Sequence, residues 1–489
     1  MEKAFDMVNR DLLFLKLLQK GINGKFYNTL KSLYTNNMYS ISLNGHLSDW
    51  FQADLGVRQG DCMSSTLFAL FINDLAKEIK ELGIGVNIGN YILSILLFAD
   101  DLALIASSEA ELQEMLDCVY TWCKKWRLKV NCDKTKIVDF RCNSSMQTDF
   151  QFKYGEDTIE KVAHYKYLGV IFDEFLTFEL AADTLSGAAG RAFGKLWSVY
   201  KGFNGLGYES FTKLFEMYVD PILLYCASIW NIKPFKCCVN IQNRAIRSFL
   251  GVHRFAPLLS VNGDMGWRSN TVKSNVCVLR LWNRIIDMAD DRLPKIVFNH
   301  DFSNSHTVWN KEILTHARSE IRYHNQEHID IITTANILHE KEVEKWENDL
   351  MLKPKLRTYS RFKYDYHVEK YVKALLRKGL RSIMAKFRFG ILPLKIETGR
   401  FTGDAVQERI CDFCNLGEVE DEFHFLVQCP LYSEQRSKLV AKATNIYPDF
   451  DTIEEDIQFV ILMSDEDLFK DTAIYLNESF KKRSELLFH

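Results

Sequence analysis

The chain has 489 residues, of which 47% are hydrophobic and 26% charged, and its formal net charge is -3. At roughly 100–200 residues per domain this length predicts two to four domains, and the composition excludes a mainly disordered chain. The chain has twelve cysteines and no apolar leader at its N-terminus, which predicts a reducing, intracellular compartment. Charged residues interrupt every apolar run before it reaches the ~18 residues of a membrane span. We therefore expect a soluble protein without a membrane partner, in the nucleus or the cytoplasm.

The first predicted elements are two helices. Residues 8–19 carry five leucines, and either Asn9 or Asp11 is suited to cap a helix there. Residues 22–35 continue the helical pattern. The N-terminal region is therefore expected to begin with a pair of packed helices.

A hairpin and a glycine-containing loop come next. Residues 39–51 alternate around Asn44-Gly45, which is the strongest short hairpin signal. Residues 55–62 (LGVRQGDC) then lead into an apolar helix over residues 65–79. The glycines allow close backbone approach, and the free N-H groups of a helix start can bind an anion such as a phosphate. A plain helix entry is the alternative.

An apolar, strand-forming run over residues 91–106 is interrupted by Asp100-Asp101. Two ionised carboxylates would be costly to bury, so the pair must lie at a turn, bind cations, or both. One interpretation is a metal site in a strand-turn-strand hairpin. The alternative is an Asp-Asp turn that faces water.

The following segments alternate between helix and strand before the pattern becomes helical. Residues 109–126 predict an amphipathic helix, and residues 150–173 predict short strands. From residue 177 to about 250 the pattern is helical, and residues 280–289 and 336–351 are further helix candidates. These segments together predict an α+β N-terminal region followed by helices.

Residues 353–389 are strongly basic. Twelve Lys and Arg alternate there with aromatic residues, among them the six residues Tyr359, Phe362, Tyr364, Tyr366, Tyr371 and Phe387. Cations for phosphates and flat rings for bases are the combination typical of nucleic-acid binding. A solvated amphipathic helix is the alternative.

Four potential metal ligands lie within 19 residues near the C-terminus: Cys411, Cys414, His424 and Cys429, in the pattern C-x2-C-x9-H-x4-C. Three thiolates and one imidazole at this spacing predict a closed, tetrahedral structural Zn²⁺ site. Idle thiols in a reducing compartment are the alternative. The acidic flank, residues 418–422, argues against this loop itself gripping phosphate.

Taken in chain order, five motifs resemble the palm of a reverse transcriptase, and they are most similar to those of non-LTR (LINE-type) retrotransposons. The motifs are Lys3-Ala4-Phe5-Asp6, Gly56 to Asp61 (GVRQGD), Phe98 to Asp101 (FADD), Asn131 to Lys136 after a Trp/Lys-rich helix, and Leu168-Gly169. The resemblance extends over residues 1–251. It returns at the Cys/His pattern, which is similar to the C-terminal CCHC-type knuckle of these elements.

The resemblance implies an α+β fold class: a reverse-transcriptase palm with an incomplete split βαβ, then a helical thumb, a mainly helical connector and a small CCHC zinc knuckle. The expected boundaries are an N-terminally truncated palm at 1–140, a primer-grip hairpin at 141–175, the thumb at 176–300, the basic connector at 301–400, the knuckle at 401–440 and an acidic helical tail at 441–489.

The implied activity is two-metal nucleotidyl transfer with an RNA template, a DNA primer or target DNA, and dNTPs as partners. The primer 3′ hydroxyl attacks the α-phosphate of a dNTP while two Mg²⁺ ions stabilise the attacking and leaving oxygens. Mg²⁺ prefers hard oxygen ligands and completes its coordination with substrate phosphates and water. Asp100 is the implied principal ligand, with Asp101 adjacent.

The resemblance implies roles for further residues at matching motif positions. They are Phe5 as the gate against the sugar of the incoming nucleotide; Arg58, Gln59 and Gly60 as contacts to template and dNTP; Lys134 as proton donor to pyrophosphate; and Tyr167, Leu168 and Gly169 as the primer grip.

One departure from the family bears on activity. The family's first catalytic aspartate falls, in this register, immediately before Met1, and the fingers precede that point. We therefore expect a C-terminal portion of a longer polyprotein or a decayed copy, with impaired catalysis. Asp6, which follows the gate residue, is expected to cap a helix or to be a surface charge. The rival hypotheses are a non-catalytic nucleic-acid-binding scaffold and a group II intron-type maturase, and the Cys/His pattern favours the non-LTR class over the latter.

Overall fold

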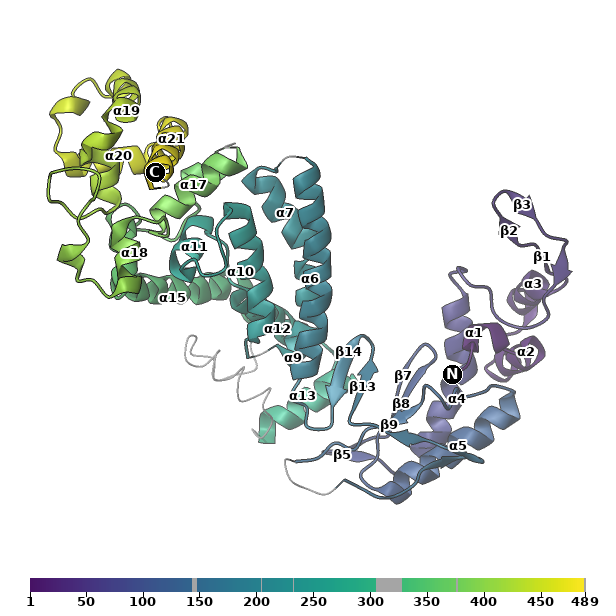
Figure 1. Cartoon of the computed structure of the whole chain (residues 1–489). Coiled ribbons are helices and arrows are strands. Elements are labelled where there is room, and N and C mark those ends of the chain that lie inside the picture. The colour runs from purple at the N-terminus through teal and green to yellow at the C-terminus, as the bar shows by residue number, and fades with distance from the viewer. Residues whose placement is uncertain (143–146, 204, 232, 305–327, 375–376, 488–489) are drawn as a thin grey trace. The chain divides into compact units, whose positions relative to one another are not determined.

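The computed structural model describes residues 1–142, 147–203, 205–231, 233–304, 328–374 and 377–487, and these form an α+β structure that is mainly helical (Figure 1). The chain divides into two compact units. The first unit is Met1–Phe178 together with the segment that carries α13 (Leu293–Asn304), and the second is Glu179–Asp287 together with the described residues from His328 onward. No helix in these described ranges combines the length and apolar character that crossing a membrane requires.

The first unit contains, besides α13, five described helices: α1 (Ala4–Met7), α2 (Arg10–Gln19), α3 (Gly24–Tyr34), α4 (Ser64–Glu81) and α5 (Glu109–Trp126). Its strands are short and pair two by two: β1 (Met38–Tyr39) with β4 (Phe51–Gln52), β2 (Ser42–Leu43) with β3 (His46–Leu47), β5 (Val86–Ile88) with β6 (Tyr91–Leu93), β7 (Ile95–Phe98) with β8 (Asp101–Leu104), β9 (Lys136–Ile137) with β12 (Glu160–Lys161), β10 (Lys153–Tyr154) with β11 (Asp157–Thr158), and β13 (His164–Tyr167) with β14 (Val170–Asp173). The β9/β12 pair is parallel and the others are antiparallel.

Several of these elements follow from local signals in the sequence. Helix α5 has the predicted bounds, because the Ser108 side chain caps its first turn and Arg127, at φ 57°, ends it in the left-handed conformation. The predicted cap Asn9 accepts a hydrogen bond at the start of α2. Asn44 and Gly45 both have positive φ, 51° and 83°, as a tight turn between β2 and β3 requires.

Helices α2, α4 and α5 pack together and form the core of the first unit. The ammonium group of Lys16 lies inside this core. Lys16 donates to the Phe71 carbonyl at 2.5 Å and to Asp74 at 2.8 Å, and its Nζ lies 3.6 Å from the ring centroid of Trp126. Burial lowers the pKa of Lys16 to about 8, although the hydrogen bond and the charge of Asp74 oppose this shift.

The second unit is built from helices. They are α6 (Glu179–Gly202), α7 (Tyr208–Tyr218), α8 (Asp220–Leu223), α9 (Ala227–Trp230), α10 (Lys236–Leu250), α11 (Leu258–Met265), α12 (Asn270–Ile286), α15 (Ile331–Met351), α16 (Lys370–Lys373), α17 (Lys378–Arg388), α18 (Lys395–Thr402), α19 (Ser433–Ile446), α20 (Glu455–Ser464) and α21 (Phe469–Leu487). Short turns join them: η1 (Pro354–Leu356), η2 (Tyr359–Arg361), η3 (Val406–Glu408), the π-turn η4 (His424–Gln428), η5 (Pro430–Tyr432) and η6 (Phe450–Thr452). Helix α6 packs against α10, and α17 packs against α21.

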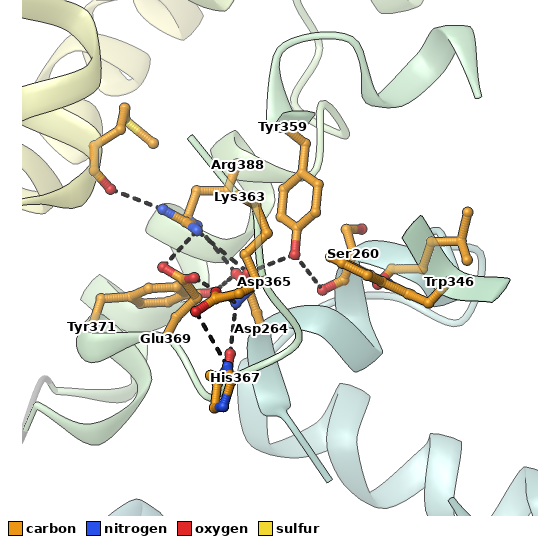
Figure 2. Close-up of polar contacts among 12 residues, drawn as sticks. Ser260, Asp264, Trp346, Tyr359, Lys363, Asp365, His367, Glu369, Tyr371 and Arg388 are labelled. Atoms are coloured by element: carbon orange, nitrogen blue, oxygen red, sulfur yellow. Dashed lines mark hydrogen bonds and ion pairs between the residues drawn. The ribbon is translucent and has the colours of Figure 1, made fainter. Parts of the chain in front are cut away.

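A buried polar network joins α11, η2, α16 and α17 in this unit (Figure 2). Arg388, fully buried, lies 3.1 Å from a carboxylate oxygen of the equally buried Asp264 and 2.7 Å from one of Glu369. Asp264 also accepts hydrogen bonds from the hydroxyls of Tyr359, at 2.8 Å, and Tyr371, at 2.7 Å. Burial by itself would lower the pKa of Arg388, but the charges of Asp264 and Glu369 raise it above its ordinary value.

This network corrects the interpretation of residues 353–389 as a nucleic-acid surface formed by their own rings. Four of the six rings are buried: Tyr359, Phe362, Tyr371 and Phe387. Three of the cations are buried as well: Lys363, Arg381 and Arg388. Rings enclosed in a core cannot stack on bases, so most of this aromatic content holds the second unit together. The segment is also divided among η1, η2, α16 and α17 and forms no continuous amphipathic helix.

Candidate functional site

The carboxylate pair lies at the tip of a hairpin, as predicted. Strands β7 and β8 pair in a register that sets Phe98 opposite Asp101, so Ala99 and Asp100 form the two-residue turn, with Ala99 at φ 52°. Asp101 is exposed and Asp100 half-buried. Within the described ranges neither carboxylate has an ion-pair partner, which leaves both available to a cation.

Two other segments of the first unit contact this tip. The amino group of Met1 donates to the Asp100 carbonyl oxygen at 3.2 Å. Tyr167, at the end of β13, lies close enough to Asp101 that the carboxylate, after burial, contributes to raising the pKa of the tyrosine. Leu168 and Gly169 turn this β13–β14 hairpin with φ 46° and 88°. The structure therefore places the sequence-predicted Tyr167 beside the aspartate pair.

The glycine loop is held against α1 through its backbone. Val57 N donates to the Phe5 carbonyl and Gly56 N to that of Val8, both at 2.8 Å. Gly56 has φ 82°, and a Cβ added there would lie 2.7 Å from the Asp6 carbonyl oxygen, so the position requires glycine. The Gln59 side chain donates to the Asp6 carboxylate at 2.8 Å. Asp6 lies within the short helix α1 and is exposed, so the surface-charge expectation is confirmed and the capping expectation is wrong.

Phe5 and Arg58 are both engaged in contacts within the first unit. The Phe5 ring stacks on Phe68 with the centroids 4.6 Å apart. The Arg58 guanidinium donates to the Leu33 carbonyl at 2.6 Å and to the Asn37 side chain at 2.7 Å. Arg58 is therefore anchored to the C-terminal end of α3 and its following loop, while Gln59 and Gly60 are exposed.

A groove of about 920 Å³ lies beside the glycine loop. Its lining combines carboxylates, arginines and an aromatic ring, contributed by Asp6, Arg10, Tyr39, Asp54, Arg58 and Gln59 among others. Arg10 and Arg58 already donate to acceptors of the first unit, and Asp6 and Asp54 share the lining, so the groove carries charges of both signs.

Arg10 is a residue of this groove that sequence reasoning missed. Its guanidinium is buried and donates to four backbone carbonyls, those of Gly56 at 3.0 Å, Tyr34 at 3.0 Å, Ala53 at 2.5 Å and Leu55 at 3.1 Å. Arg10 thereby holds in place the backbone that leads into the glycine loop. Backbone acceptors carry no sequence signature, and the only available signal was an arginine on the apolar face of a leucine-rich helix.

Lys134 is exposed and follows α5 in a turn in which its backbone N-H donates to the Asn131 side chain at 3.0 Å. Its carbonyl accepts from the Tyr165 hydroxyl at 3.1 Å. Among the described residues Lys134 makes no ion pair, so no described contact joins its ammonium group to the aspartate pair.

The second unit brings the four predicted metal ligands together. The ligand atoms of Cys411, Cys414, His424 and Cys429 all lie within 4.8 Å of one another. Two of the sulfurs, those of Cys411 and Cys429, are 4.0 Å apart, and the Cys414 sulfur is 3.4 Å from His424 Nε2. A tetrahedral ion with Zn-S bonds of ~2.3 Å has S···S edges of about 3.8 Å. The donor set and its spacing fit a zinc ion.

The surroundings hold these ligands in place. The Cys411 N-H donates to the Glu418 carbonyl at 2.9 Å, and the Cys429 N-H to that of His424 at 2.7 Å. Arg436 donates to the Cys429 carbonyl at 2.7 Å. Burial raises the pKa of the Cys411 thiol to about 12. A bound metal would instead keep such thiols deprotonated.

The acidic flank of this cluster is largely internal. Glu420 is buried and forms a two-point ion pair with Arg483 of α21, at 2.9 and 2.8 Å. Glu422, also buried, accepts from the Thr358 hydroxyl at 2.8 Å, and burial raises its pKa. These carboxylates therefore connect the Cys/His loop to the rest of the unit.

Comparison with known proteins finds similarities of the N-terminal region. Residues 1–172 match the family described as reverse transcriptase (RNA-dependent DNA polymerase). The chain is 25% identical over 237 residues to the RNA-directed DNA polymerase from mobile element jockey of Drosophila funebris, and 27% identical over 268 residues to the probable RNA-directed DNA polymerase from transposon BS of Drosophila melanogaster. It is 29% identical over 177 residues to the Pol polyprotein from the type-2 retrotransposable element R2DM of Drosophila melanogaster.

These matches cover 47%, 51% and 35% of this chain, in the same order. They cover 25%, 28% and 17% of the relatives. The chain thus spans about a quarter or less of the length of two of these curated relatives and little more of the third.

Proposed function

We propose that the first unit extends a DNA primer on an RNA template by two-metal nucleotidyl transfer, because residues 1–172 match the reverse transcriptase family and are similar to polymerases of non-LTR retrotransposons. One observation carries the proposal: the β7–β8 turn presents Asp100 and Asp101 side by side, free of ion-pair partners in the described ranges, next to Tyr167.

The carboxylates of Asp100 and Asp101 are the proposed Mg²⁺ ligands. Hard oxygen donors with access to water suit Mg²⁺, which takes one or two protein carboxylates and fills its other positions with substrate phosphates and water. When bound, the metal pair supplies stabilisation of the attacking 3′ oxygen and of the leaving pyrophosphate. The protein's task is then to position primer and nucleotide.

Positioning falls to the groove and to the β13–β14 hairpin. Gln59, which is exposed at the groove, and the exposed Gly60 that follows it would contact template and dNTP, with Arg58 as an anchored neighbour. Phe5, fixed by stacking, would lie against the nucleotide sugar. Tyr167, Leu168 and Gly169 would hold the primer end near the aspartates. Lys134 would donate a proton to the leaving pyrophosphate.

The rest of the proposed organisation follows the chain. The division between units after Phe178 supports a palm and primer-grip hairpin ahead of a helical thumb. The helices beyond the thumb would form the connector and the C-terminal tail, with the Cys/His cluster as a structural zinc knuckle between them. The close spacing of Cys411, Cys414, His424 and Cys429 supports this last assignment.

Primer extension tests the proposed activity. The purified chain is incubated with Mg²⁺, dNTPs and a DNA primer annealed to an RNA template, beside the variant Asp100→Asn/Asp101→Asn. Because both substitutions keep the size of the side chains and remove only their charge, they isolate metal binding. Extension by the parent that the double variant lacks would support the assignment.

A non-catalytic nucleic-acid-binding scaffold is the second candidate, because only two of the expected carboxylates lie in the described hairpin. It predicts that parent and double variant bind the primer–template equally well and that neither extends it. Extension at equal rates by both proteins would contradict both hypotheses about the aspartate pair.

A further inference from the structure

The loop GVHRFAP, which joins α10 to α11 in the second unit, has a fixed conformation. Gly251 ends α10 with φ 71°, and the Val252 N-H donates back to the Arg247 carbonyl at 3.0 Å. The Ser382 hydroxyl of α17 donates to the Gly251 carbonyl at 2.7 Å. A Cβ at residue 251 would lie only 2.8 Å from the Cβ of Ser382. The loop is thereby docked closely on α17.

This docked loop exposes an aromatic ring. Phe255 is 74% exposed. Exposing such a large apolar ring to water does not stabilise the fold, so its exposure calls for another reason. The Arg254 guanidinium lies 4.6 Å from its ring centroid. The Phe255 N-H donates to His253 Nδ1 at 3.1 Å, which fixes the backbone beneath the ring. The ring is therefore presented outward and carries a cation beside it.

Three cations on or near this loop lack matching carboxylates. Within the described ranges Arg247, Arg254 and Lys386 make no ion pair. Arg247 donates to the Ala256 carbonyl at 3.1 Å, while its buried Nε has no hydrogen-bond partner.

Two further titratable groups, His253 and Glu397, neighbour these cations. Lys386 lies about one turn after Ser382 in α17, the helix on which the loop is docked. Burial and the charges of Lys355, Lys386 and Arg247 lower the pKa of His253. Glu397 is the acidic group among these neighbours, and it is already held by Lys355 at 2.5 Å and Arg400 at 3.1 Å.

We propose that the loop around Phe255, together with Arg247, Arg254 and Lys386, is a contact surface for single-stranded nucleic acid. The cations would neutralise consecutive phosphates, and the exposed ring would stack on a base. This surface takes over the role first expected of the buried rings of residues 353–389, and it uses Lys386 of that segment. The inference rests on the proposed reverse transcriptase function, because a polymerase that copies RNA must hold a single strand outside its palm.

The test measures binding and does not depend on catalysis. Fluorescein-labelled U15 RNA and dT15 DNA are titrated with the full chain and followed by fluorescence anisotropy at several KCl concentrations. Phe255→Ala should weaken binding about tenfold without changing the salt dependence, since stacking on one base carries no counterion release. Arg254→Gln with Lys386→Gln should instead lower the slope of log K against log salt by about 1.4.

Two matched variants control for general effects. Phe203→Ala removes a ring of the same unit that is 72% exposed and, among the described residues, has no cation over it. Lys442→Gln removes one exposed charge from α19. Both should bind like the parent. All of these side chains except Lys386 are well exposed, and circular dichroism of each variant verifies that it is folded.

The outcomes separate this surface from the polymerase assignment. Weaker binding by Phe255→Ala alone supports the surface even if the chain extends no primer, and the two oligonucleotides show whether RNA or DNA is preferred. Binding within twofold of the parent, or an equal loss in Phe203→Ala, would overturn the inference and leave Phe255 as a candidate contact for another protein. Inorganic polyphosphate, which has charge but no bases, should compete equally well with the parent and with Phe255→Ala, and a weaker effect on the variant would contradict a stacking role.

Discussion

Replacing Arg388 by methionine should strongly destabilise the second unit. The substitution removes the cation between Asp264 and Glu369 while keeping a side chain that fills much of the space. Asp264, fully buried, would retain only neutral donors at its carboxylate, the hydroxyls of Tyr359 and Tyr371. Removing one partner of a buried pair costs about 3–5 kcal/mol, because the other charge stays desolvated.

An exposed ion pair of the same unit provides the control. Lys395 and Asp412 are 2.5 Å apart, closer than Arg388 and Asp264, but their side chains are 37% and 61% exposed. Water and salt screen such a pair, so Lys395→Met should cost only about 0–1 kcal/mol. The comparison tests whether the loss of stability on breaking an ion pair depends on the burial of the pair and not on the distance between its charges.

Native-state hydrogen exchange of the full chain is the suitable assay, because a chain with two units need not unfold in one step. Amides of α11 and α17 should lose about 3–5 kcal/mol of protection in Arg388→Met, while those of the β7–β8 hairpin should not change. A loss below about 1 kcal/mol in α11 and α17, or one equal to that in Lys395→Met, would refute the reasoning.

Three further predictions concern other described contacts. Arg10→Met removes the hydrogen bonds to four carbonyls, so amides of residues 53–56 should lose about 2–4 kcal/mol of protection, and unchanged exchange would show that the guanidinium does not hold the loop. Lys16→Met should stabilise the first unit by about 1–3 kcal/mol at pH 7, because burial penalises the protonated lysine. This gain should fade from about pH 8 toward 10.5, as the folded parent loses its proton first, and a pH-independent gain in urea titrations would contradict the assignment. Cys429→Ser should abolish the retention of about one zinc per chain in metal analysis and lower protection across residues 411–429, and equal zinc content would exclude this cluster as the site.

Features encoded by neighbouring residues could be predicted from the sequence. Asn44-Gly45 specifies a tight turn whatever surrounds it, and Asp100-Asp101 could be placed at a hairpin tip because two carboxylates are costly inside a strand. The Cys/His cluster was predicted because four ligands with short spacings have few other reasons to occur together. Each of these inferences depends on fewer than twenty consecutive residues.

Features that depend on distant partners could not be predicted in this way. Composition alone does not distinguish an arginine that faces phosphate from one such as Arg388, whose partner Asp264 is 124 residues away in sequence. The same limit explains Arg10, whose acceptors are backbone carbonyls of a later loop. Asp6 was expected to cap a helix or to be a surface charge; it is exposed, but it lies inside α1 and contacts Gln59, which is 53 residues away in sequence.

The Asp264–Arg388 pair also has a consequence for biosynthesis. A ribosome adding about 5–20 residues per second needs roughly 6–25 s to synthesise the 124 residues between the two partners. During that interval α11 can form, but its aspartate has no counter-cation and must stay hydrated, so the second unit cannot close around it. We therefore expect nascent chains that end before Arg388 to remain open and protease-sensitive at α11, and compaction to follow soon after α17 leaves the exit tunnel.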